Sequence, residues 1–541
     1  MSLQTDPSTA AAPNFAFHPR WRSLTLWFIL LSTGLRLLQL SSLDLAPDEA
    51  YYWDWSRHLS LGYYDQGPLI AYLIRATTAL FGTNEFGVRI GVLLCSLGTL
   101  LCAVYLARRL FSPLAGFLTA LLLGLTPLLE VGSLIATYDP PLVLFWALAA
   151  VGLEKALFSA TDRECNLGWF ATGLATGLGF LSKHTMLLIM PCLVLFLLLS
   201  PRHRPWLLRP QPYLALLLTL FCYTGVFYWN AHHHWWTFGH LLFLTHKSSS
   251  PLLHRIGDYF GSQAVLLGPG LFFATLAVSV PPFLAALKTR RLPAGEEDTA
   301  ERTQTKALLL ACLGLPVFAF FTLMAFKAKV QGNWAVCAWL TPTILFAGWS
   351  AQAMQRSVQN CKRQIRLVTV IGLLSLLPTI LLVTPSLRLL LGIRVPADTD
   401  ISNTAYGWRE VAGRVQQVRE AMARDGHPHV FIAGNGYQYP ALLAFYLPDH
   451  PETNDMFIHN RLTMYAAYVE NLKGKNGYDA IYVNENEVED APLRYEFERV
   501  EWEPPLEIYR RPYSATPIRT VHIARCYGYR HYMGLEWHEG G

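Results

Sequence analysis

The chain has 541 residues, of which 52% are hydrophobic and 15% are charged. Soluble domains usually carry about a quarter charged residues, so this composition excludes an ordinary soluble protein and predicts a membrane protein with many spans, surrounded by membrane lipids. The formal net charge of +5 does not indicate a nucleic-acid partner, because most of the excess Lys and Arg lies in loops between apolar runs.

Residues 1–19 are polar and rich in Pro and Ala, and we expect them to form a disordered cytoplasmic leader. The first apolar run lacks a small-residue cleavage site, which favours a retained membrane helix over a signal peptide. A bilayer core of about 30 Å needs roughly 17–25 apolar residues per helix. Residues 20–391 are therefore predicted to form a transmembrane domain of about eleven helices, at 24–43, 86–107, 114–131, 141–158, 167–182, 185–200, 212–229, 263–287, 307–326, 334–350 and 367–391.

Basic residues are concentrated before the first predicted helix and in every second loop. The loops after the second, fourth, sixth, eighth and tenth helices carry them, beginning with Arg108 and Arg109. The positive-inside rule places these loops in the cytoplasm. The remaining loops then face outward, to the periplasm if the cell is a Gram-negative bacterium.

The polar tail, residues 392–541, is predicted to be a small α/β domain on the same outer face. Residues 406–424 have apolar positions at helical spacing. A short apolar run at 429–433 ends in a Gly-Asn-Gly turn signal, and further strands are expected at 480–483, 506–509 and 520–524.

The first outward loop contains two adjacent acids, Asp48 and Glu49, followed by aromatic residues. Ionisable residues near a membrane span are often functional. Acids also favour helix N-termini, so the pair has a second interpretation as the cap of a helix that begins after Pro47. The two interpretations are compatible, because only one acid needs to act as a catalytic base.

The same loop continues with Tyr63, Tyr64 and Asp65. The tyrosines suit a surface at headgroup level or a platform for a sugar. Asp65 is a second acid, able to bind a metal or an acceptor. An ordinary turn before an interfacial helix is the alternative.

Asp139 lies at the outward start of the fourth predicted helix, where an isolated Asp is usually a helix cap. It gains functional interest because it shares the outer face with Asp48. Lys327 and Lys329 lie at the outward end of a span, against the positive-inside trend. Either a lipid phosphate or snorkelling of the side chains explains them.

The largest outward loop, 230–262, holds three adjacent histidines, His246 and Arg255. Adjacent histidines do not easily ligate one metal, so the triplet indicates an interfacial loop rather than a zinc site. His246 with Asp48 or Asp65 would make a sparse metal site, which the sequence does not decide. Arg255 is a candidate partner for a phosphate or a solvated charge at the rim.

In their order along the chain, these motifs resemble the GT-C glycosyltransferases related to protein O-mannosyltransferases. That superfamily includes the enzyme that adds aminoarabinose to lipid A. The tail motifs resemble the bacterial subgroup that includes galacturonosyltransferases of lipopolysaccharide core and lipid A. The residues that carry the resemblance are 48–52 (DEAYY), 64–69 (YDQGPL), 138–141 (YDPP), 182–185 (SKHT), 229–232 (WNAH), 267–269 (LGP), 329–334 (KVQGNW), 406–410 (YGWRE) and 444–448 (AFYLP).

The resemblance implies a mainly α, polytopic GT-C fold in the bacterial inner membrane, with the tail domain in the periplasm. It implies inverting transfer of a monosaccharide from a polyprenyl-phosphate donor, without a nucleotide sugar. The acceptor would be an outer-face glycolipid such as lipid A or lipopolysaccharide, a glycan or a protein. The family's catalytic acid falls on Asp48, as general base, and its second acid falls on Asp139.

The resemblance also implies binding residues. In some relatives an acid of the first loop and a loop histidine hold a divalent metal, which corresponds to Asp65 and His246 here; no other cofactor is expected. Relatives often carry a cation where this chain has Gln66, so the donor phosphate needs another partner. The expected substrate-binding residues are Glu49, Tyr51, Tyr63, Tyr64, Asp65, Arg255, Lys327 and Lys329.

Two other classes of function are compatible with a polytopic chain. A lipid or sugar transporter, or a flippase, would carry acids and bases inside its spans and half-helices broken by Gly or Pro. A non-catalytic scaffold or sensor would use the tail as its working part. The ionisable residues of this sequence collect in outward loops, which favours surface chemistry.

Overall fold

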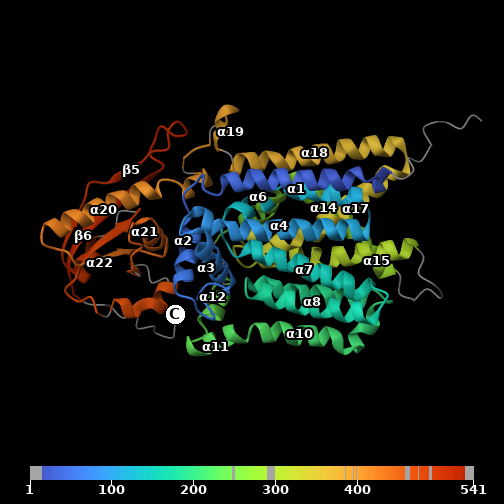
Figure 1. Cartoon of the computed structure of the whole chain (residues 1–541), viewed down its shortest axis with the longest axis horizontal. Coiled ribbons are helices and arrows are strands. Elements are labelled where there is room, and N and C mark those ends of the chain that lie inside the picture. Colours follow the sequence, from blue (N-terminus) through green and yellow to red (C-terminus); the bar gives the residue numbers. More distant parts are fainter. Residues whose placement is uncertain are drawn as a thin grey trace, which may run out of the picture.

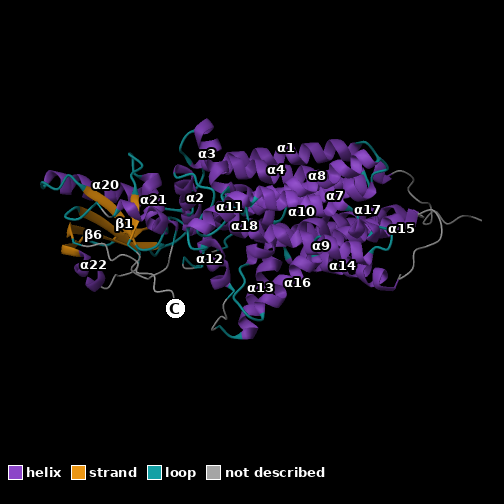
Figure 2. Ribbon diagram, turned by 90° about the horizontal axis from the view of Figure 1, so that it is seen from below, coloured by secondary structure: helices purple, strands orange, loops and turns teal. Residues whose placement is uncertain are grey.

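In the computed structural model, the apolar runs form helices that lie side by side, and the tail forms an α/β domain at one end of them (Figure 1; Figure 2). The structure describes residues 15–245, 250–288, 299–383, 385–393, 395–397, 399–456, 463–472, 474–485 and 490–530. Of the predicted leader, residues 1–14 lie outside this part, and a short 3-10 helix, η2 (Phe15–Phe17), precedes the first long helix.

The helical part contains long membrane helices and shorter segments between them. The bounds of these elements, in which η denotes a 3-10 helix, are α1 (Arg20–Gln39), α2 (Pro47–Arg57), α3 (Leu69–Phe81), α4 (Glu85–Leu110), α5 (Pro113–Gly124), α6 (Pro127–Leu134), α7 (Asp139–Phe158), α8 (Asp162–Phe180), η3 (His184–Leu188), α9 (Ile189–Leu199), η4 (Arg204–Leu208), α10 (Pro210–Cys222), α11 (Thr224–His232), α12 (Trp236–Leu244), α13 (Leu252–Leu267), α14 (Pro269–Lys288), α15 (Thr299–Cys312), α16 (Leu315–Ala325), η5 (Gly332–Trp339), α17 (Leu340–Arg356), α18 (Val358–Val383) and α19 (Pro385–Leu390).

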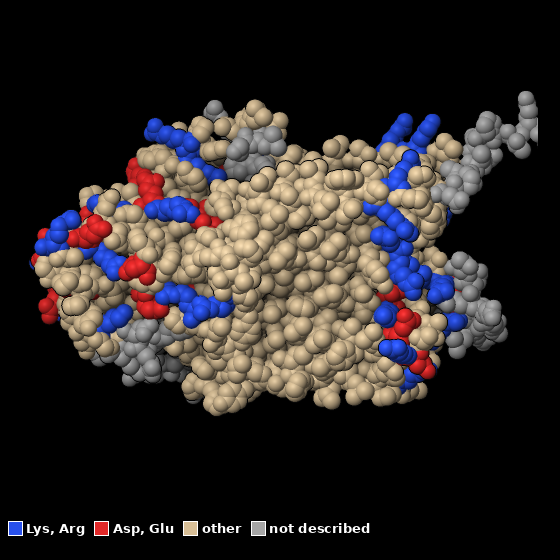
Figure 3. All heavy atoms as spheres, in the orientation of Figure 1, with Lys and Arg blue, Asp and Glu red and all other residues tan. Residues whose placement is uncertain are grey.

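Each of the eleven predicted ranges falls on helical structure, but the count of eleven spans is not confirmed. Within the described residues, six helices are long and apolar enough to cross a membrane, or eight if each bent pair is one span. The bent pairs are α5 with α6, at 64°, and α10 with α11, at 43°. Figure 3 shows charged side chains gathered at the two ends of the molecule, with a broad uncharged band between them. The chain is therefore a multi-span membrane protein.

The bend between α5 and α6 has a local cause. Pro127 is the first residue of α6 and cannot donate a backbone hydrogen bond to the preceding turn. The hydroxyl of Thr126 accepts a hydrogen bond from the amide of Leu129 and so caps the new helix. The apolar run at 114–131, predicted as one helix, thus forms the two helices α5 and α6.

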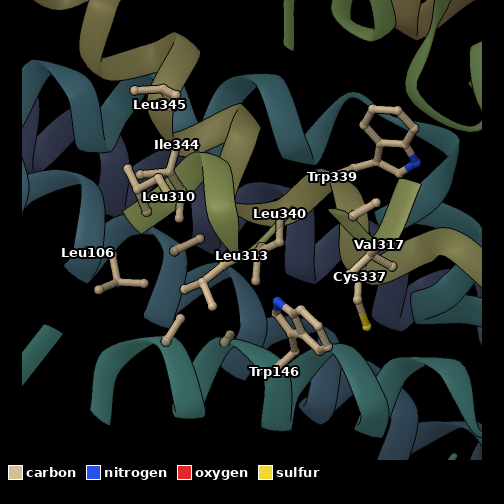
Figure 4. Close-up of a cluster of buried hydrophobic side chains, with 14 of the residues drawn as sticks. Leu106, Trp146, Leu310, Leu313, Val317, Cys337, Trp339, Leu340, Ile344 and Leu345 are labelled. Atoms are coloured by element: carbon tan, nitrogen blue, oxygen red, sulfur yellow. The ribbon is translucent and has the colours of Figure 1, made fainter. Parts of the chain in front are cut away.

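The membrane helices enclose a large hydrophobic core. Figure 4 shows Trp146 of α7 pointing toward Leu313 and Leu340, with Trp339 of η5 in the same cluster. All four side chains are buried. This core surrounds η5, so the segment after α16 is held inside the bundle.

The tail domain confirms the predicted α/β class. Its elements are η6 (Ile401–Ala405), α20 (Trp408–Arg424), β1 (Val430–Gly434), α21 (Gln438–Tyr446), β2 (Thr453–Asp455), η7 (Met464–Asn471), β3 (Asp479–Asn484), α22 (Asp490–Glu496), β4 (Phe497–Trp502), β5 (Leu506–Ile508) and β6 (Arg519–Tyr529). The strand order is β2-β1-β3-β6-β4, with β5 paired to β6. Strands β1, β2 and β3 run parallel, and β6 is antiparallel to its neighbours.

The tail domain docks on α2, which lies between it and the long helices (Figure 1). Apolar residues of α2, α20, α21 and the sheet belong to one continuous buried cluster. At its centre the rings of Trp53 and Phe445 meet edge to face, with centroids 4.9 Å apart. At its rim Arg57 donates hydrogen bonds to the carbonyls of His450 and Pro451. The tail and the first outward loop therefore form one packed unit.

The start of α2 is fixed by Glu49, which is fully buried. Its carboxylate accepts a hydrogen bond of 2.9 Å from the backbone amide of Ala46, the N-cap residue of α2. It also accepts two hydrogen bonds from Arg89 of α4, at 2.8 and 2.7 Å, and one from the amide of Ala136. Arg89 further donates to the carbonyl of Leu40, where α1 ends. One ion pair thus joins α2 to the first membrane helices.

Removing the Arg89 side chain should destabilise the protein strongly, because it leaves Glu49 as an uncompensated buried charge. We expect Arg89→Leu to lower the free energy of unfolding by about 3–5 kcal/mol. Unfolding of the purified protein in detergent measures the change. Arg75→Leu, at an exposed arginine of α3, is the matched control and should stay within about 0.5 kcal/mol of wild type. Equal losses in the two variants would contradict this role of the pair.

Candidate active site

A cavity of about 340 Å³ lies where α2, the first outward loop and the tail domain meet the ends of the membrane helices. This volume is at the lower end of the range for small-molecule sites. The residues that line it are Asp48, Tyr51, Tyr52, Asp65, Gln66, Tyr138, Lys183, His184, Thr185, Leu188, His240, Leu241, Leu244, Thr245, Phe320, Phe321, Met324, Gln331, Trp334 and Tyr437.

The walls of the cavity differ in polarity by element. Helix α2, the first outward loop and the tail supply acids, tyrosines and an amide. Helices α12 and α16, η3 and η5 supply most of the apolar residues, namely Leu188, Leu241, Leu244, Phe320, Phe321, Met324 and Trp334. On the outer side of α16, Leu323 is 70% exposed, as expected of a lipid-facing residue. The site therefore suits a ligand with a polar part and an apolar part.

Asp48 is the accessible acid of the site. It is the second residue of α2 and exposed, whereas its neighbour Glu49 is buried in the ion pair. Its Oδ1 accepts a hydrogen bond of 2.7 Å from the hydroxyl of Tyr437 in the tail domain. Glu49 therefore caps the helix, as one interpretation expects, and Asp48 lines the cavity, so its role as a base stays a prediction.

Asp65 is the second acid that lines the cavity. Its Oδ2 accepts a hydrogen bond of 3.0 Å from the hydroxyl of Tyr51. The same hydroxyl accepts a hydrogen bond from the backbone amide of Met464, at 2.5 Å. The ring of Tyr51 stacks on Tyr437, with centroids 4.4 Å apart. Asp65 is therefore linked through Tyr51 to the tail domain.

Lys183 supplies a cation to the cavity. It follows the end of α8 and is held by Ser182, whose hydroxyl donates to the carbonyl of Tyr138 at 2.7 Å. Its ammonium lies 2.7 Å from Asp139 Oδ1 and 4.8 Å above the ring of Tyr138. Oδ2 of Asp139 also accepts a hydrogen bond of 2.7 Å from the side-chain amide of Asn333. Asp139 itself does not line the cavity and instead holds Lys183 there.

Gln66 occupies the position at which the chain departs from the family pattern. Its Oε1 lies 3.1 Å from Nδ1 of His184, and Nε2 of His184 lies 2.6 Å from the hydroxyl of Tyr223. An amide oxygen only accepts, so Nδ1 carries the proton and Nε2 accepts from the phenol. Gln66 therefore belongs to a neutral hydrogen-bonded chain in this part of the site.

The metal expected from the resemblance finds a partial match. Among the described residues there is no group of three His, Cys, Asp or Glu side chains that could hold a metal ion. Within the cavity, Asp65 and His240 form an acid–histidine pair, with Oδ1 and Nε2 3.8 Å apart. His246, the histidine proposed from the sequence, lies outside the described residues. The described side chains thus offer two ligands, fewer than a protein-only metal site uses.

Tyr52 completes the polar wall beside Asp48. Burial raises the pKa of Tyr52 well above its usual value, and the nearby phenol of Tyr138 and carboxylate of Asp48 act in the same direction. Tyr52 therefore stays neutral over the physiological range and keeps its hydroxyl proton for donation.

The structure places several of the expected site residues away from the cavity. Glu49 is buried in its ion pair with Arg89 and does not line the cavity. Tyr63 is fully buried, stacks on Trp55 at 4.4 Å and donates to backbone carbonyls, so it holds the loop rather than a sugar. Tyr64 packs on His240 at 4.9 Å and lies outside the cavity lining.

The three basic residues expected to hold the phosphate are also placed elsewhere. Arg255 is buried and donates to the carbonyls of Ala325 and Phe326 at the end of α16. Lys327 and Lys329 are exposed and do not line the cavity. Of the expected site residues, the structure thus brings together Asp48, Tyr51 and Asp65, with Asp139 behind them.

Sequence reasoning did not assign a role to Lys183, His240 or Tyr437. A signal for Lys183 was present, since it is a basic residue at an outward helix end, like Lys329. His240 stands inside an apolar run, which resembles an ordinary helix. Tyr437 lies 389 residues from Asp48, and no local pattern reports a contact across that separation.

The chain is similar in sequence to proteins that are named as sugar transferases. A family model described as dolichyl-phosphate-mannose-protein mannosyltransferase matches residues 65–229. A lipid A galacturonosyltransferase of Rhizobium johnstonii is 31% identical over 324 residues, covering 59% of this chain and 62% of the relative. An undecaprenyl phosphate-aminoarabinose arabinosyl transferase of Pseudomonas aeruginosa is 32% identical over 321 residues, covering 56% of each. The matches thus span less than two thirds of these relatives.

Similarity in fold extends further than similarity in sequence. The crystal structure of ArnT from Cupriavidus metallidurans, in the apo state, has a TM-score of 0.62 and 16% identity, covering 93% of this chain and 98% of ArnT. ArnT bound to undecaprenyl phosphate also has a TM-score of 0.62. The oligosaccharyltransferase AglB of Archaeoglobus fulgidus has a TM-score of 0.51 and 12% identity, covering 86% of this chain and 69% of AglB. The chain thus has the fold of ArnT over nearly its whole length and is similar in sequence, over part of its length, to proteins named as glycosyltransferases.

Proposed function

We propose that the protein transfers a monosaccharide from a polyprenyl-phosphate donor to a lipid A-type glycolipid. The observation that carries this proposal is one cavity that combines an accessible carboxylate, a buried lysine and an apolar wall. A sugar-phosphate lipid has matching parts, namely a polar sugar, an anionic phosphate and a hydrocarbon chain. The named activities of the relatives from Rhizobium and Pseudomonas support the same class of donor and acceptor.

In the proposed reaction Asp48 is the general base. Its carboxylate takes the proton from an acceptor hydroxyl as the acceptor oxygen bonds to the anomeric carbon of the sugar. The bond from that carbon to the phosphate oxygen breaks, and its electron pair leaves with the polyprenyl phosphate. Attack from the face opposite the phosphate inverts the anomeric configuration. The exposure of Asp48 to the cavity supports this role.

Lys183 is the proposed partner of the donor phosphate. Among the described residues that line the cavity, Lys183 is the one lysine, and there is no arginine. Its ion pair with Asp139 positions the ammonium, and Asn333 would keep Asp139 hydrogen-bonded when the ammonium turns to a phosphate. A charge-assisted hydrogen bond of this kind stabilises the leaving group as its negative charge develops. Lys183 thus takes the place proposed from the sequence for Lys329 and Arg255.

We place the reaction at the outer face of the inner membrane, with the tail domain in the periplasm. The charge pattern of the loops supports this orientation, because the cavity is built from loops on the side opposite the basic ones. The apolar wall on α12 and α16 would receive the first part of the polyprenyl chain from the bilayer.

A transporter would explain some of the same features. Arg36 and Glu130 form an ion pair within the bundle at 2.7 Å, and the bent pair α5–α6 breaks at Pro127. These two charges neutralise each other, however, whereas Asp48 and Asp65 line a cavity at the ends of the helices. We therefore favour surface chemistry over transport.

Asp48→Asn tests the proposed base. Asparagine keeps the shape of the side chain and can still accept from Tyr437, but it cannot take a proton. We expect kcat to fall at least about 100-fold. The assay combines purified protein with polyprenyl-phosphate galacturonic acid or polyprenyl-phosphate aminoarabinose and lipid A, and mass spectrometry follows the glycosylated product. Asp258→Asn, at an exposed acid of α13, is the control. Activity near wild type in folded Asp48→Asn protein would rule out the assignment.

Replacing Lys183 tests the phosphate site. We expect Lys183→Ala to lower kcat/KM for the donor by about 10- to 150-fold, the usual worth of a hydrogen bond to a charged group. Lys329→Ala is measured beside it, because that exposed lysine is the alternative from the sequence. A melting temperature for each variant separates loss of binding from loss of folding. A normal kcat/KM in Lys183→Ala with a reduced value in Lys329→Ala would contradict the assignment.

A further inference from the structure

Tyr437 belongs to the tail domain but contacts Asp48 in the cavity. From this contact we propose that the tail domain is part of the active site, with Tyr437 as the residue that positions the general base. The proposal rests on the proposed function, since it assumes that Asp48 is that base. It adds a residue that lies 389 positions beyond Asp48 in the sequence.

The hydrogen bond from Tyr437 controls the orientation of the carboxylate. Asp48 lies near the start of α2, and its side chain is exposed to the cavity. A short side chain in such a place can rotate between several orientations. The phenol donates to Oδ1 at 2.7 Å, and because this fixes one oxygen it also sets the direction of the other. A fixed carboxylate is aligned with the acceptor hydroxyl before the reaction begins.

The same tail segment organises the second acid. The ring of Tyr437 stacks on Tyr51, whose hydroxyl donates to Asp65. The backbone amide of Met464 donates to that hydroxyl and so commits its proton to Asp65. Two tail residues therefore contribute to the hydrogen bonding of both acids in the cavity, Tyr437 directly to Asp48 and Met464 through Tyr51 to Asp65.

One residue of the tail domain, Asp455, holds the two segments that contain Tyr437 and Met464. Asp455, at the end of β2, is 1% exposed. Its Oδ1 accepts from the amide of Gly436 at 2.9 Å, and its Oδ2 accepts from the hydroxyl of Thr463 at 3.0 Å. These are the residues directly before Tyr437 and Met464. One buried carboxylate thus anchors both segments that reach the active site.

The local backbone also requires this arrangement. Gly436 has a φ of +77°, a conformation that residues with a Cβ rarely adopt, and it turns the chain from β1 into α21. The turn lies at the carboxyl edge of the parallel strands β1 and β2, where open α/β sheets usually present their functional residues. In this protein that edge faces α2, and the shared core around Trp53 and Phe445 holds it there.

Tyr437→Phe tests the proposal, since it removes the hydroxyl and keeps the ring that stacks on Tyr51. We expect kcat to fall about tenfold or more, with KM for the donor within about twofold of wild type. A merely structural residue would change folding, or KM and kcat together. Tyr495→Phe, at an exposed tyrosine of α22, is the matched control and should match wild type. The full-length protein, the assay and the donors are those used for Asp48→Asn.

The double variant Asp48→Asn/Tyr437→Phe shows whether the tyrosine acts through the base. We expect kcat of the double variant to equal that of Asp48→Asn, because the orientation of residue 48 no longer matters once it cannot take a proton. If the two losses of kcat multiply in the double variant, the positioning role is overturned. It is also overturned if the loss of kcat in Tyr437→Phe is matched by a lower melting temperature. Wild-type kcat in Tyr437→Phe with an inactive Asp48→Asn would overturn this inference alone. Full activity in both single variants would instead refute the proposed function.

Discussion

The buried ion pair between Glu49 and Arg89 is the interaction on which the site depends. Arg89 ties Glu49 to the ends of the first membrane helices and so fixes where α2 begins. Successive residues of a helix point about 100° apart, so burying Glu49 turns Asp48 toward the cavity. The two adjacent acids therefore have different roles. Glu49 stabilises the fold through its ion pair with Arg89, and Asp48 is exposed to the cavity.

The second constraint is that the site is assembled from distant parts of the chain. The tail packs on α2 through a shared hydrophobic core, which brings Tyr437 to Asp48 and Met464 to Tyr51. Lys183 arrives from the end of α8 and is held by Asp139 at the start of α7. The charges of the cavity therefore depend on the packing of helices and tail, and changes remote from the cavity should alter its chemistry.

Much of the fold could be predicted from the sequence, because apolar runs and charged loops report directly on the membrane. The membrane class, the α/β tail and the importance of the first outward loop all follow from local patterns. The bend within the apolar run 114–131 does not, since it depends on where Pro127 starts a new helix, and the count of eleven spans is not confirmed. Which residues line the cavity is harder to predict from the sequence. Glu49 and Tyr63 have the residue types of a binding site but are used for packing. Tyr437 reaches the site through a tertiary contact that no local pattern encodes.

The central claim is that the protein transfers a sugar from a lipid phosphate rather than moving a lipid across the membrane. The most direct test is the stoichiometry of the reaction in liposomes that contain purified protein, a polyprenyl-phosphate sugar and lipid A. We expect one free polyprenyl phosphate to be released for each sugar found on lipid A, with inverted anomeric configuration. Movement of intact donor across the bilayer, without release of polyprenyl phosphate or glycosylation of lipid A, would contradict the account.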